Sequence, residues 1–293
     1  MNSKTMKDTK KKLLVIYGPT AVGKTSLAIK LALKYNTEII SADSRQFYKE
    51  MKIGTAVPEP QELATVKHHF IRHKSIHENY NVGLFEKDAI MKIDELFKKH
   101  NTLVIVGGSG LYIDAVCKGL DTFPDIQESV RTELREQFEK RGLQWLQNEV
   151  KNVDPQFYAS ADTNNHQRLL RCLEVCVQSG STFSSFKNSE QKIRPFDIEY
   201  YSIRMDRESL YQRINNRVDI MVEKGLLNEV KSLADYQNLN ALKTVGYTEF
   251  FQYLNDEITF ERAIELVKQN SRRYAKRQIT WLKRYSVNWV ENQ

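Results

Sequence analysis

Gly18-Pro-Thr-Ala-Val-Gly-Lys24-Thr25 fits the pattern G-x-x-x-x-G-K-[ST] at every defined position. The apolar run Leu13–Tyr17 precedes it and predicts a buried strand, and Ser26–Leu33 follows it and predicts a helix. A strand, a glycine loop and a helix in this order are the context in which the pattern marks a phosphate-binding loop. We therefore predict an α/β fold in which this loop binds a di- or triphosphate.

Each residue type in the loop has a physical role. Gly18 and Gly23 allow a backbone path that points N–H groups at phosphate oxygens. The helix that follows adds the positive end of its dipole. Lys24 reaches a terminal phosphate, and the Thr25 hydroxyl is a ligand for Mg²⁺. The residues predicted to bind the phosphates are Gly18, Pro19, Thr20, Ala21, Val22, Gly23, Lys24 and Thr25.

Composition places the chain among ordinary globular proteins. Of its 293 residues, 41% are hydrophobic and 28% are charged, which is enough for a sizeable core. The formal net charge of +7 permits a polyanionic partner without proving one. Three cysteines suit a reducing compartment better than a disulfide framework. The lysine-rich N-terminus is followed by no long apolar stretch, so we expect no membrane segment and a cytoplasmic protein.

The pattern along the chain predicts a core interrupted by an insertion. We expect residues 1–11 to form a disordered basic tail. Residues 12–120 alternate strand and helix, which is typical of a parallel sheet with helices on both faces. Residues 121–196 show helical periodicity without a clear strand and predict a helical insertion domain, after which the α/β pattern resumes over 197–293. Strand-forming runs in the core lie at Thr37–Ser41, Leu103–Val106, Glu199–Met205 and Val287–Val290.

Asp43 follows the second expected strand, in Ser41-Ala-Asp-Ser-Arg-Gln46. At the carboxyl edge of a parallel sheet this carboxylate faces the phosphate loop, where it can act as a general base or as a Mg²⁺ ligand. An aspartate that caps a turn or a helix is an equally good interpretation. The strand Leu103–Val106 runs into Gly107-Gly108 instead of a metal-binding carboxylate, which disfavours an ATPase.

The C-terminal helix, expected over about Thr259–Arg284, carries basic residues and no acidic residue after Ser271. The basic residues are Arg272, Arg273, Lys276, Arg277, Lys283 and Arg284. One stripe at helical spacing consists of Tyr274, Gln278, Trp281 and Tyr285. We expect the stripe to pack on the core and the bases to face outward toward phosphates, because a merely solvated helix face usually mixes signs.

Other clusters are ambiguous when taken singly. Basic residues also gather at His166–Arg171 in the insertion and at Arg213 and Arg217, one helical turn apart, although such residues are more often surface residues or ion pairs. Histidines recur every fourth position at His69, His73 and His77, but no neighbouring carboxylate or cysteine set completes a metal site. Cys172 and Cys176 share an apolar helix side and are interpreted as buried thiols.

Several segments together point to one family. They are Gly18–Thr25, Ser41–Tyr48, Ile53–Ala56, Val106–Tyr112, Gln167–Val175, Thr244–Tyr247 and Arg273–Trp281. With these segments in order over nearly its whole length, the chain resembles the bacterial tRNA dimethylallyltransferases of the tRNA isopentenyltransferase family. The segments Ser41–Tyr48 and Arg273–Trp281 are more specific than the phosphate loop. We expect the bacterial type, because no zinc-finger pattern like that of the eukaryotic versions follows Arg273–Trp281.

The resemblance implies an activity. Such an enzyme transfers a dimethylallyl group from dimethylallyl diphosphate to N6 of adenosine 37, in tRNAs that read codons beginning with U, and releases diphosphate. Asp43 would be the general base that takes the N6 proton. Thr20 and Arg217 would contact the diphosphate and neutralise the leaving group. The phosphate loop would hold the diphosphate with Mg²⁺, bound through Thr25.

The resemblance also implies how the second substrate is bound. The partner would be the anticodon stem-loop of tRNA, whose target adenosine leaves the base stack to enter a channel, and the enzyme is expected to be a monomer. The implied contacts to tRNA are Asp43, Ser44, Arg45, Gln46, Ser109, Arg131, Gln167, Arg168, Leu169, Leu170, Arg171, Lys243, Gly246, Lys276, Arg277, Gln278, Trp281 and Lys283. Ser109 stands where the family commonly has threonine, and the hydroxyl is kept.

Three other functions share parts of this pattern. An adenylate isopentenyltransferase that acts on free adenine nucleotide and a small-molecule kinase both use such a phosphate loop. A nucleic-acid-binding module without chemistry would use the basic surface alone. The basic C-terminal helix and the cluster His166–Arg171 favour a large polyanionic substrate over a free nucleotide.

Overall fold

The protein is described here by a computed structural model, which covers residues 10–187 and 192–291. Residues 1–9 of the expected disordered tail lie outside this range. Lys10 forms an ion pair with Asp197 at 2.5 Å, and Lys11 donates a hydrogen bond to the carbonyl of His100 at 2.9 Å. These contacts place Lys10 and Lys11, which were expected to be disordered, within the folded structure.

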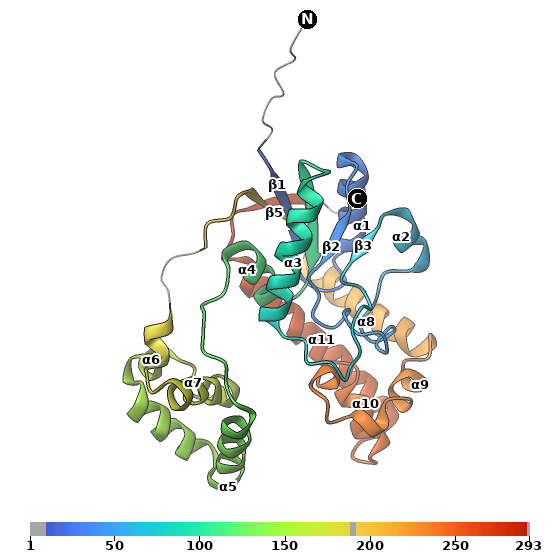
Figure 1. Ribbon diagram of the computed structural model, residues 1–293. Helices are drawn as coiled ribbons and strands as arrows, with labels where there is room; N and C mark the ends of the chain where they lie inside the picture. Colours follow the sequence, from blue (N-terminus) through green and yellow to red (C-terminus); the bar gives the residue numbers. More distant parts are fainter. Residues whose placement is uncertain (1–9, 188–191, 292–293) are drawn as a thin grey trace, which may run out of the picture. The chain divides into compact units, whose positions relative to one another are not determined.

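The larger of two compact units contains a six-stranded sheet in the order β3-β2-β4-β1-β5-β6 (Figure 1). The strands are β1 (Lys12–Tyr17), β2 (Ile39–Ser41), β3 (His68–His69), β4 (Thr102–Gly107), β5 (Asp197–Arg204) and β6 (Val287–Glu291). All of these strands pair in parallel, so the predicted parallel α/β fold is confirmed. The short edge strand β3 was not predicted, because two histidines carry no strand pattern.

Helices cover both faces of the sheet, as the α/β pattern predicted (Figure 1). On one face, Leu14 and Ile16 of β1 pack with Ala28 of α1 (Lys24–Tyr35). On the other face, Leu13 of β1 packs in one cluster with Ile93 of α3 (Val82–Phe97) and with residues of α4 (Gly110–Lys118). Both sides of β1 are therefore buried, which explains why its sequence is continuously apolar instead of alternating.

A second hydrophobic cluster in the same unit is built mainly from helices. These helices are α8 (Arg207–Glu223), α9 (Leu226–Lys231), α10 (Thr248–Leu254) and α11 (Phe260–Leu282). The helix α11 contributes Val267 to this cluster and Leu282 to the core beside the sheet. One long helix therefore links the two cores. The remaining short elements of this unit are α2 (Pro60–Thr65), η2 (Ala234–Tyr236) and η3 (Asn240–Leu242).

The smaller unit runs from Gly119 to Lys192, where the sequence suggested an insertion over residues 121–196. Its elements are α5 (Glu128–Val153), α6 (Pro155–Ser160), α7 (His166–Ser179) and the short helix η1 (Phe183–Phe186). Its own core contains Leu146, Phe157 and Leu169, all nearly inaccessible to solvent. The backbone of α5 leaves helical geometry at Gly142, where φ is +74°. Among the described helices, none is both long enough and apolar enough to cross a membrane.

Candidate active site

The phosphate loop lies between β1 and α1, at the carboxyl edge of the sheet. Gly23 is the N-cap residue of α1 and has φ at +103°, a backbone conformation that favours glycine. Gly18 is needed for a different reason, since a Cβ there would lie 2.8 Å from Oγ of Ser202. Ala21 also has a positive φ, of +64°, without being glycine. Close packing and left-handed backbone together shape the loop.

Lys24 is folded back over the loop that precedes it. Its Nζ donates a hydrogen bond to the carbonyl of Pro19 at 2.7 Å. Burial and the nearby Arg217 lower the pKa of this ammonium to about 7, against an opposing effect from Asp43. Near neutral pH the lysine is therefore only partly charged before a ligand binds.

Arg217 reaches the loop from α8. Its guanidinium donates to the hydroxyl of Thr20 at 3.0 Å. Burial lowers the pKa of Arg217, and the carboxylate of Asp43 opposes that effect. The structure thus brings Arg217 to the loop that contains Thr20 and Lys24, although Arg217 is 197 positions from Thr20 in the sequence. Two cations at one loop suit a group with several negative charges.

Asp43 comes two residues after β2 and is half-buried. Its Oδ1 accepts the backbone N–H of Arg45 at 3.0 Å, which is the turn-capping role that the sequence left open. Its Oδ2 accepts no hydrogen bond from any described residue, and it lies 3.8 Å from where a Cβ of Gly108 would be. One carboxylate oxygen therefore holds the turn, and the other is available for chemistry at the end of β4.

Gln278 of α11 joins the phosphate loop to the end of β4. Its Oε1 accepts the backbone N–H of Thr20 at 2.8 Å, and its Nε2 donates to the carbonyl of Gly108 at 2.8 Å. A Cβ on Gly108 would lie 2.4 Å from that Nε2, so this position requires glycine. Tyr274, one turn earlier in α11, also donates to the carbonyl of Gly108, at 3.2 Å. The stripe of α11 therefore packs on the core, as its spacing predicted.

The spacing along α11 and the resemblance gave Gln278 two different roles. The resemblance placed it among the tRNA contacts, but only 3% of its surface is exposed and its amide is engaged on both sides. No local pattern signals its bond to Thr20, because the two residues are 258 positions apart. The structure places this side chain in the interior, where it supports the phosphate loop.

Ser44 and Arg45, which follow Asp43, both form hydrogen bonds to residues that are distant in the sequence. Ser44 donates its backbone N–H to the hydroxyl of Ser109 at 3.1 Å, so two of the expected tRNA contacts lie side by side. The guanidinium of Arg45 donates to the carbonyls of Asn240, Ala241 and Lys243, at 2.9, 3.0 and 3.4 Å. Arg45 thus anchors the loop before Gly246, another segment expected to contact tRNA.

The protein-family model described as IPP transferase matches residues 46–285, which is most of the chain. The chain belongs to this family. The family that its motifs suggested is thereby confirmed.

Two relatives extend the match over nearly the full chain. The tRNA dimethylallyltransferase of Christiangramia forsetii is 51% identical over 280 residues, which cover 95% of this chain and 93% of that protein. The tRNA dimethylallyltransferase of Flavobacterium psychrophilum is 50% identical over 278 residues, which cover 93% of this chain and 91% of that protein.

Solved structures share the fold. The tRNA isopentenylpyrophosphate transferase of Bacillus halodurans is 38% identical, with a TM-score of 0.71, over 96% of this chain and 90% of that one. A eukaryotic dimethylallyltransferase acting on tRNA is 28% identical, with a TM-score of 0.79, over 96% of this chain and 74% of that one. The α/β architecture is therefore that of known IPP transferases.

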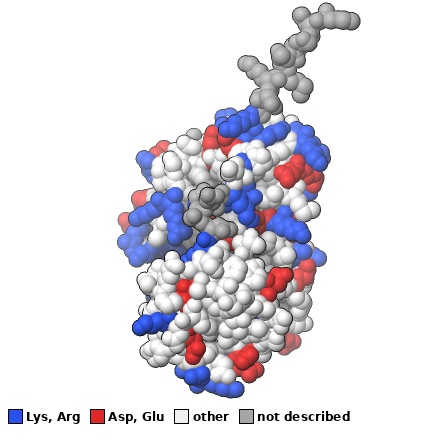
Figure 2. Space-filling view, turned by 60° about the vertical axis from the view of Figure 1, so that its left-hand side comes forward, with Lys and Arg blue, Asp and Glu red and all other residues white. Residues whose placement is uncertain are grey.

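In this IPP transferase, the outer side of α11 is strongly basic. The exposed basic side chains are Arg273, Lys276 and Arg277 on the helix and Lys283 and Arg284 directly after it. None of them forms an ion pair with any residue in the described part of the chain. Lys276, Arg277 and Arg284 line a hollow together with Trp281, and the guanidinium of Arg284 lies 4.2 Å from the centre of the Trp281 ring. On the face drawn in Figure 2, Lys and Arg atoms form several blocks, and smaller acidic patches lie beside some of them.

Some of the tRNA contacts expected in the smaller unit are exposed to solvent, and others are buried. Gln167 and Arg168 are exposed at the start of α7, whereas Leu169 is fully buried and Leu170 is 9% exposed. The buried Glu174 lies 3.4 Å from Arg171 and 3.9 Å from Arg131, so two of the basic residues share one carboxylate. The two leucines contribute to the core of the unit, and the polar residues beside them form its surface.

The histidines at every fourth position do not form a site. They lie in β3 and the following loop instead of on a helix. His69 contacts Glu38 at 2.6 Å, and His73 packs edge-on against Phe47 in an aromatic cluster, where burial lowers its pKa to about 4. His77 packs edge-on against Tyr236. This agrees with the interpretation from the sequence.

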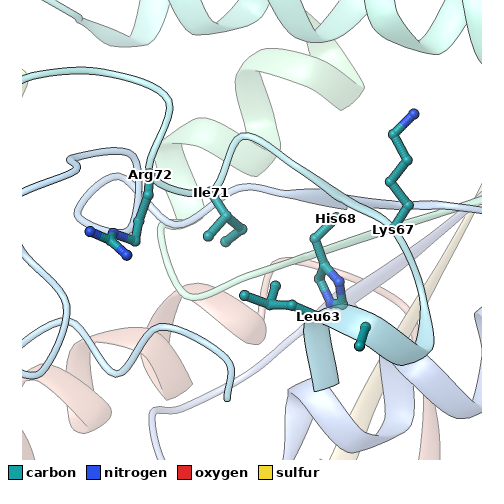
Figure 3. Close-up of a pocket in the computed structure, with 6 residues that line it drawn as sticks. Leu63, Lys67, His68, Ile71 and Arg72 are labelled. Carbon is teal, nitrogen blue, oxygen red and sulfur yellow. The ribbon is translucent and has the colours of Figure 1, made fainter. Parts of the chain in front are cut away.

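A shallow hollow lies beside β3 (Figure 3). Leu63, His68 and Ile71 turn their side chains toward one another there, while Lys67 and Arg72 point away. The two cations are already engaged, Lys67 with Glu38 at 3.3 Å and Arg72 with the carbonyl of Lys49 at 2.7 Å. The lining is therefore mixed, and neither cation points into the hollow.

The cysteines of α7 lie in the core of the smaller unit. In the described part of the chain, Asp154, Cys172 and Cys176 are the one group of possible metal ligands that come within reach of a common ion. The carboxylate of Asp154 already accepts hydrogen bonds from Phe157 and from both the N–H and the hydroxyl of Ser184. Burial raises the pKa of both thiols, so they stay protonated. These features fit the buried thiols expected from the sequence.

Proposed function

We propose that this IPP transferase moves a dimethylallyl group from dimethylallyl diphosphate to N6 of adenosine 37 in tRNAs that read codons beginning with U. The proposal rests on one observation. Asp43, which has a carboxylate oxygen without a hydrogen bond from the described residues, lies close enough to the cations Lys24 and Arg217 of the phosphate loop to affect the pKa of both. In this proposal, the general base and the cations that stabilise the leaving diphosphate lie at the same edge of the sheet. The basic face of α11 belongs to the same unit of the protein.

The reaction follows from this arrangement. The N6 nitrogen forms a bond to C1 of the dimethylallyl group, while the bond from C1 to the diphosphate oxygen breaks and its electron pair stays on the diphosphate. Asp43 takes the proton that the nitrogen loses. Lys24, Arg217 and the hydroxyl of Thr20 stabilise the charge that develops on the leaving diphosphate.

The residues present fit a Mg²⁺ ion. The Thr25 hydroxyl lies in the first turn of α1, directly after Lys24, and forms no hydrogen bond with any described residue. Hydroxyl and carboxylate oxygens are the ligands that Mg²⁺ favours, and Thr25 would hold the ion, with Asp43 close to the same loop. When bound, the ion would neutralise part of the diphosphate charge.

The tRNA would be bound by two surfaces. In the larger unit we assign this role to Asp43–Gln46, Ser109, Lys243, Gly246 and the basic face of α11, and in the smaller unit to Arg131, Gln167, Arg168 and Arg171. The net charge of +7 favours association with a polyanion. We further propose that the enzyme is a monomer in the cytoplasm, where its three free, buried cysteines would remain reduced.

Transfer of labelled prenyl group tests the proposal. The protein is incubated with radiolabelled dimethylallyl diphosphate, Mg²⁺ and either an unmodified anticodon stem-loop RNA or AMP. We expect label in the RNA and none in AMP. Label in AMP alone would identify an adenylate isopentenyltransferase, and label in neither, with phosphoryl transfer from ATP to a small molecule, would identify a kinase.

A further inference from the structure

Glu229 of α9 accepts hydrogen bonds from four donors. Its Oε2 accepts the backbone N–H groups of Lys52 at 2.9 Å and Ile53 at 2.7 Å. Its Oε1 accepts the N–H of Gly54 at 2.9 Å and the hydroxyl of Tyr247 at 2.6 Å. Three consecutive N–H groups directed at one carboxylate form an anion-binding turn. The shape of the turn at residues 52–56 therefore depends on this one side chain.

Tyr247 supports the same turn from the other side. A Cβ on Gly54 would lie 2.5 Å from Cε2 of Tyr247, so the turn backbone packs directly on the ring. Tyr247 is fully buried, and burial together with the charge of Glu229 raises the pKa of its hydroxyl. The hydroxyl therefore stays protonated and remains a donor to Glu229.

Glu229 lies on a helix, α9, that is packed firmly against the rest of the unit. Leu226 and Val230, on either side of Glu229 in α9, are fully buried in one cluster with Met51, the residue before the turn. A packed helix holds its side chains closer to one position than a loop does. Glu229 can therefore hold the turn in one conformation.

The turn at residues 52–56 fixes the orientation of the Gln46 side chain. The Nε2 of Gln46 donates to the carbonyls of Thr55 at 3.1 Å and Ala56 at 3.0 Å. Both amide hydrogens are used, and the amide cannot rotate without placing its oxygen against those two carbonyl oxygens. The Oε1 of Gln46 accepts no hydrogen bond from any described residue. The turn thus leaves Gln46 with an acceptor, and not a donor, to offer to a ligand.

We propose that Glu229 is a positioning residue for the RNA substrate, because it shapes the turn that presents the Gln46 oxygen to an N–H group of an unstacked base. The inference rests on the proposed function, in which Gln46 belongs to a segment that contacts RNA. Amino and imino groups on exposed base edges supply such donors. The diphosphate is held elsewhere, by the phosphate loop, so Glu229 affects one substrate and not the other.

Steady-state kinetics of Glu229→Gln test this inference. The glutamine keeps the size of the side chain but turns an NH₂ group toward at least one backbone N–H of the turn. With an anticodon stem-loop RNA as acceptor, we expect the KM for RNA to rise about tenfold, the effect of losing roughly one hydrogen bond. The KM for dimethylallyl diphosphate is expected to stay unchanged.

A double variant separates positioning from general loss of structure. If Glu229 acts through Gln46, then Gln46→Ala raises the KM for RNA, and adding Glu229→Gln to it has little further effect. Gly54→Ala disturbs the same turn by pushing against Tyr247 and serves as a second probe in case Glu229→Gln does not fold. It is expected to raise the same KM.

Thr259→Ala is the matched control. Thr259 caps the N-terminus of α11 by accepting the N–H of Arg262 and forms no hydrogen bond with residues 52–56, so its loss lowers stability while the hydrogen bonds of the turn remain. Its KM for RNA is expected to equal that of the wild type. Wild-type protein that transfers no prenyl group to RNA overturns the proposed function. Active wild type with an unchanged RNA KM in Glu229→Gln, or with additive effects in the double variant, overturns this inference alone.

Discussion

The charge of Lys24 depends on what occupies the phosphate loop. Burial and Arg217 lower its pKa to about 7 in the free protein, and a bound diphosphate would favour the protonated form. Between pH 7 and 9 we therefore expect binding of inorganic diphosphate to take up as much as about one proton, and the affinity to fall as pH rises. Calorimetry in two buffers with different ionisation enthalpies measures this uptake.

Lys24→Arg provides the comparison for that experiment. The guanidinium keeps a permanent charge, so only the titration of diphosphate should remain. Equal proton uptake by wild type and Lys24→Arg would show that Lys24 is already charged before the ligand arrives.

Asp43→Asn separates the two tasks of this side chain. The amide oxygen can still accept the N–H of Arg45, so the turn is expected to persist. The general base is lost, so we expect kcat to fall about 10²- to 10⁴-fold. Single-turnover transfer measures the chemical step, and filter binding measures RNA affinity, which is expected to change little. Normal turnover by this variant would exclude Asp43 as the base.

A neighbouring side chain, and not the backbone angles, restricts position 108 to glycine. In Gly108→Ala the new Cβ would meet Nε2 of Gln278 at 2.4 Å, so Gln278 must shift and release Thr20. We expect a loss of about 1–3 kcal/mol in unfolding free energy and a higher KM for dimethylallyl diphosphate. Denaturant melts and kinetics measure the two effects. Gly83→Ala, in the first turn of α3 with its nearest contact at 3.3 Å, should show neither.

At the scale of elements, α11 has one side in the core and one in solvent. Its buried side includes Ala275, Gln278 and Leu282, whereas Arg273, Lys276 and Arg277 are exposed. We expect Arg277→Ala to make the dependence of RNA affinity on salt shallower by about one unit of the logarithmic slope, because one phosphate contact is lost. Binding to a stem-loop RNA over a series of salt concentrations measures that slope.

Arg262→Ala is the control on the same helix. Arg262 lies in the first turn of α11 and pairs with Glu265 at 3.0 Å, so its removal should leave the slope as it is. A slope that does not change in Arg277→Ala would remove this part of α11 from the RNA interface.

At the scale of the whole molecule, the two units have separate cores. Asp154 is buried in the smaller unit and caps α6, and it accepts three hydrogen bonds there. In Asp154→Ala we expect faster amide hydrogen exchange within residues 119–192 only, because the buried donors lose about 1–3 kcal/mol of stabilisation each. Mass spectrometry of peptides from the exchanged protein locates the change.

Asp206→Ala gives the reciprocal test. Asp206 caps α8 in the larger unit by accepting the N–H of Ser209, so faster exchange should be confined to that unit. If either variant accelerates exchange throughout both units, the two cores unfold together.

The phosphate loop, the parallel sheet and the stripe of α11 could be read from local patterns. Each depends on spacing within a few dozen residues: glycines next to a strand and a helix, continuous apolar runs, and side chains that recur at helical intervals. The start of β2 was placed two residues early, because the N–H of Thr37 still bonds to the carbonyl of Ala32 in α1. Resemblance supplied the residue roles that spacing could not.

The connections between these parts depend on the fold. Gln278 bonds to Thr20 from 258 positions away, Arg45 anchors a loop from 195 positions away, and Glu229 holds a turn from 177 positions away. No period or motif encodes such pairs, since buried polar groups take whichever partners the packed chain brings within reach. Local chemistry in the sequence therefore specified a phosphate loop in an α/β protein. Long-range packing alone determined which side of Gln46 is presented and why Gly108 must be glycine.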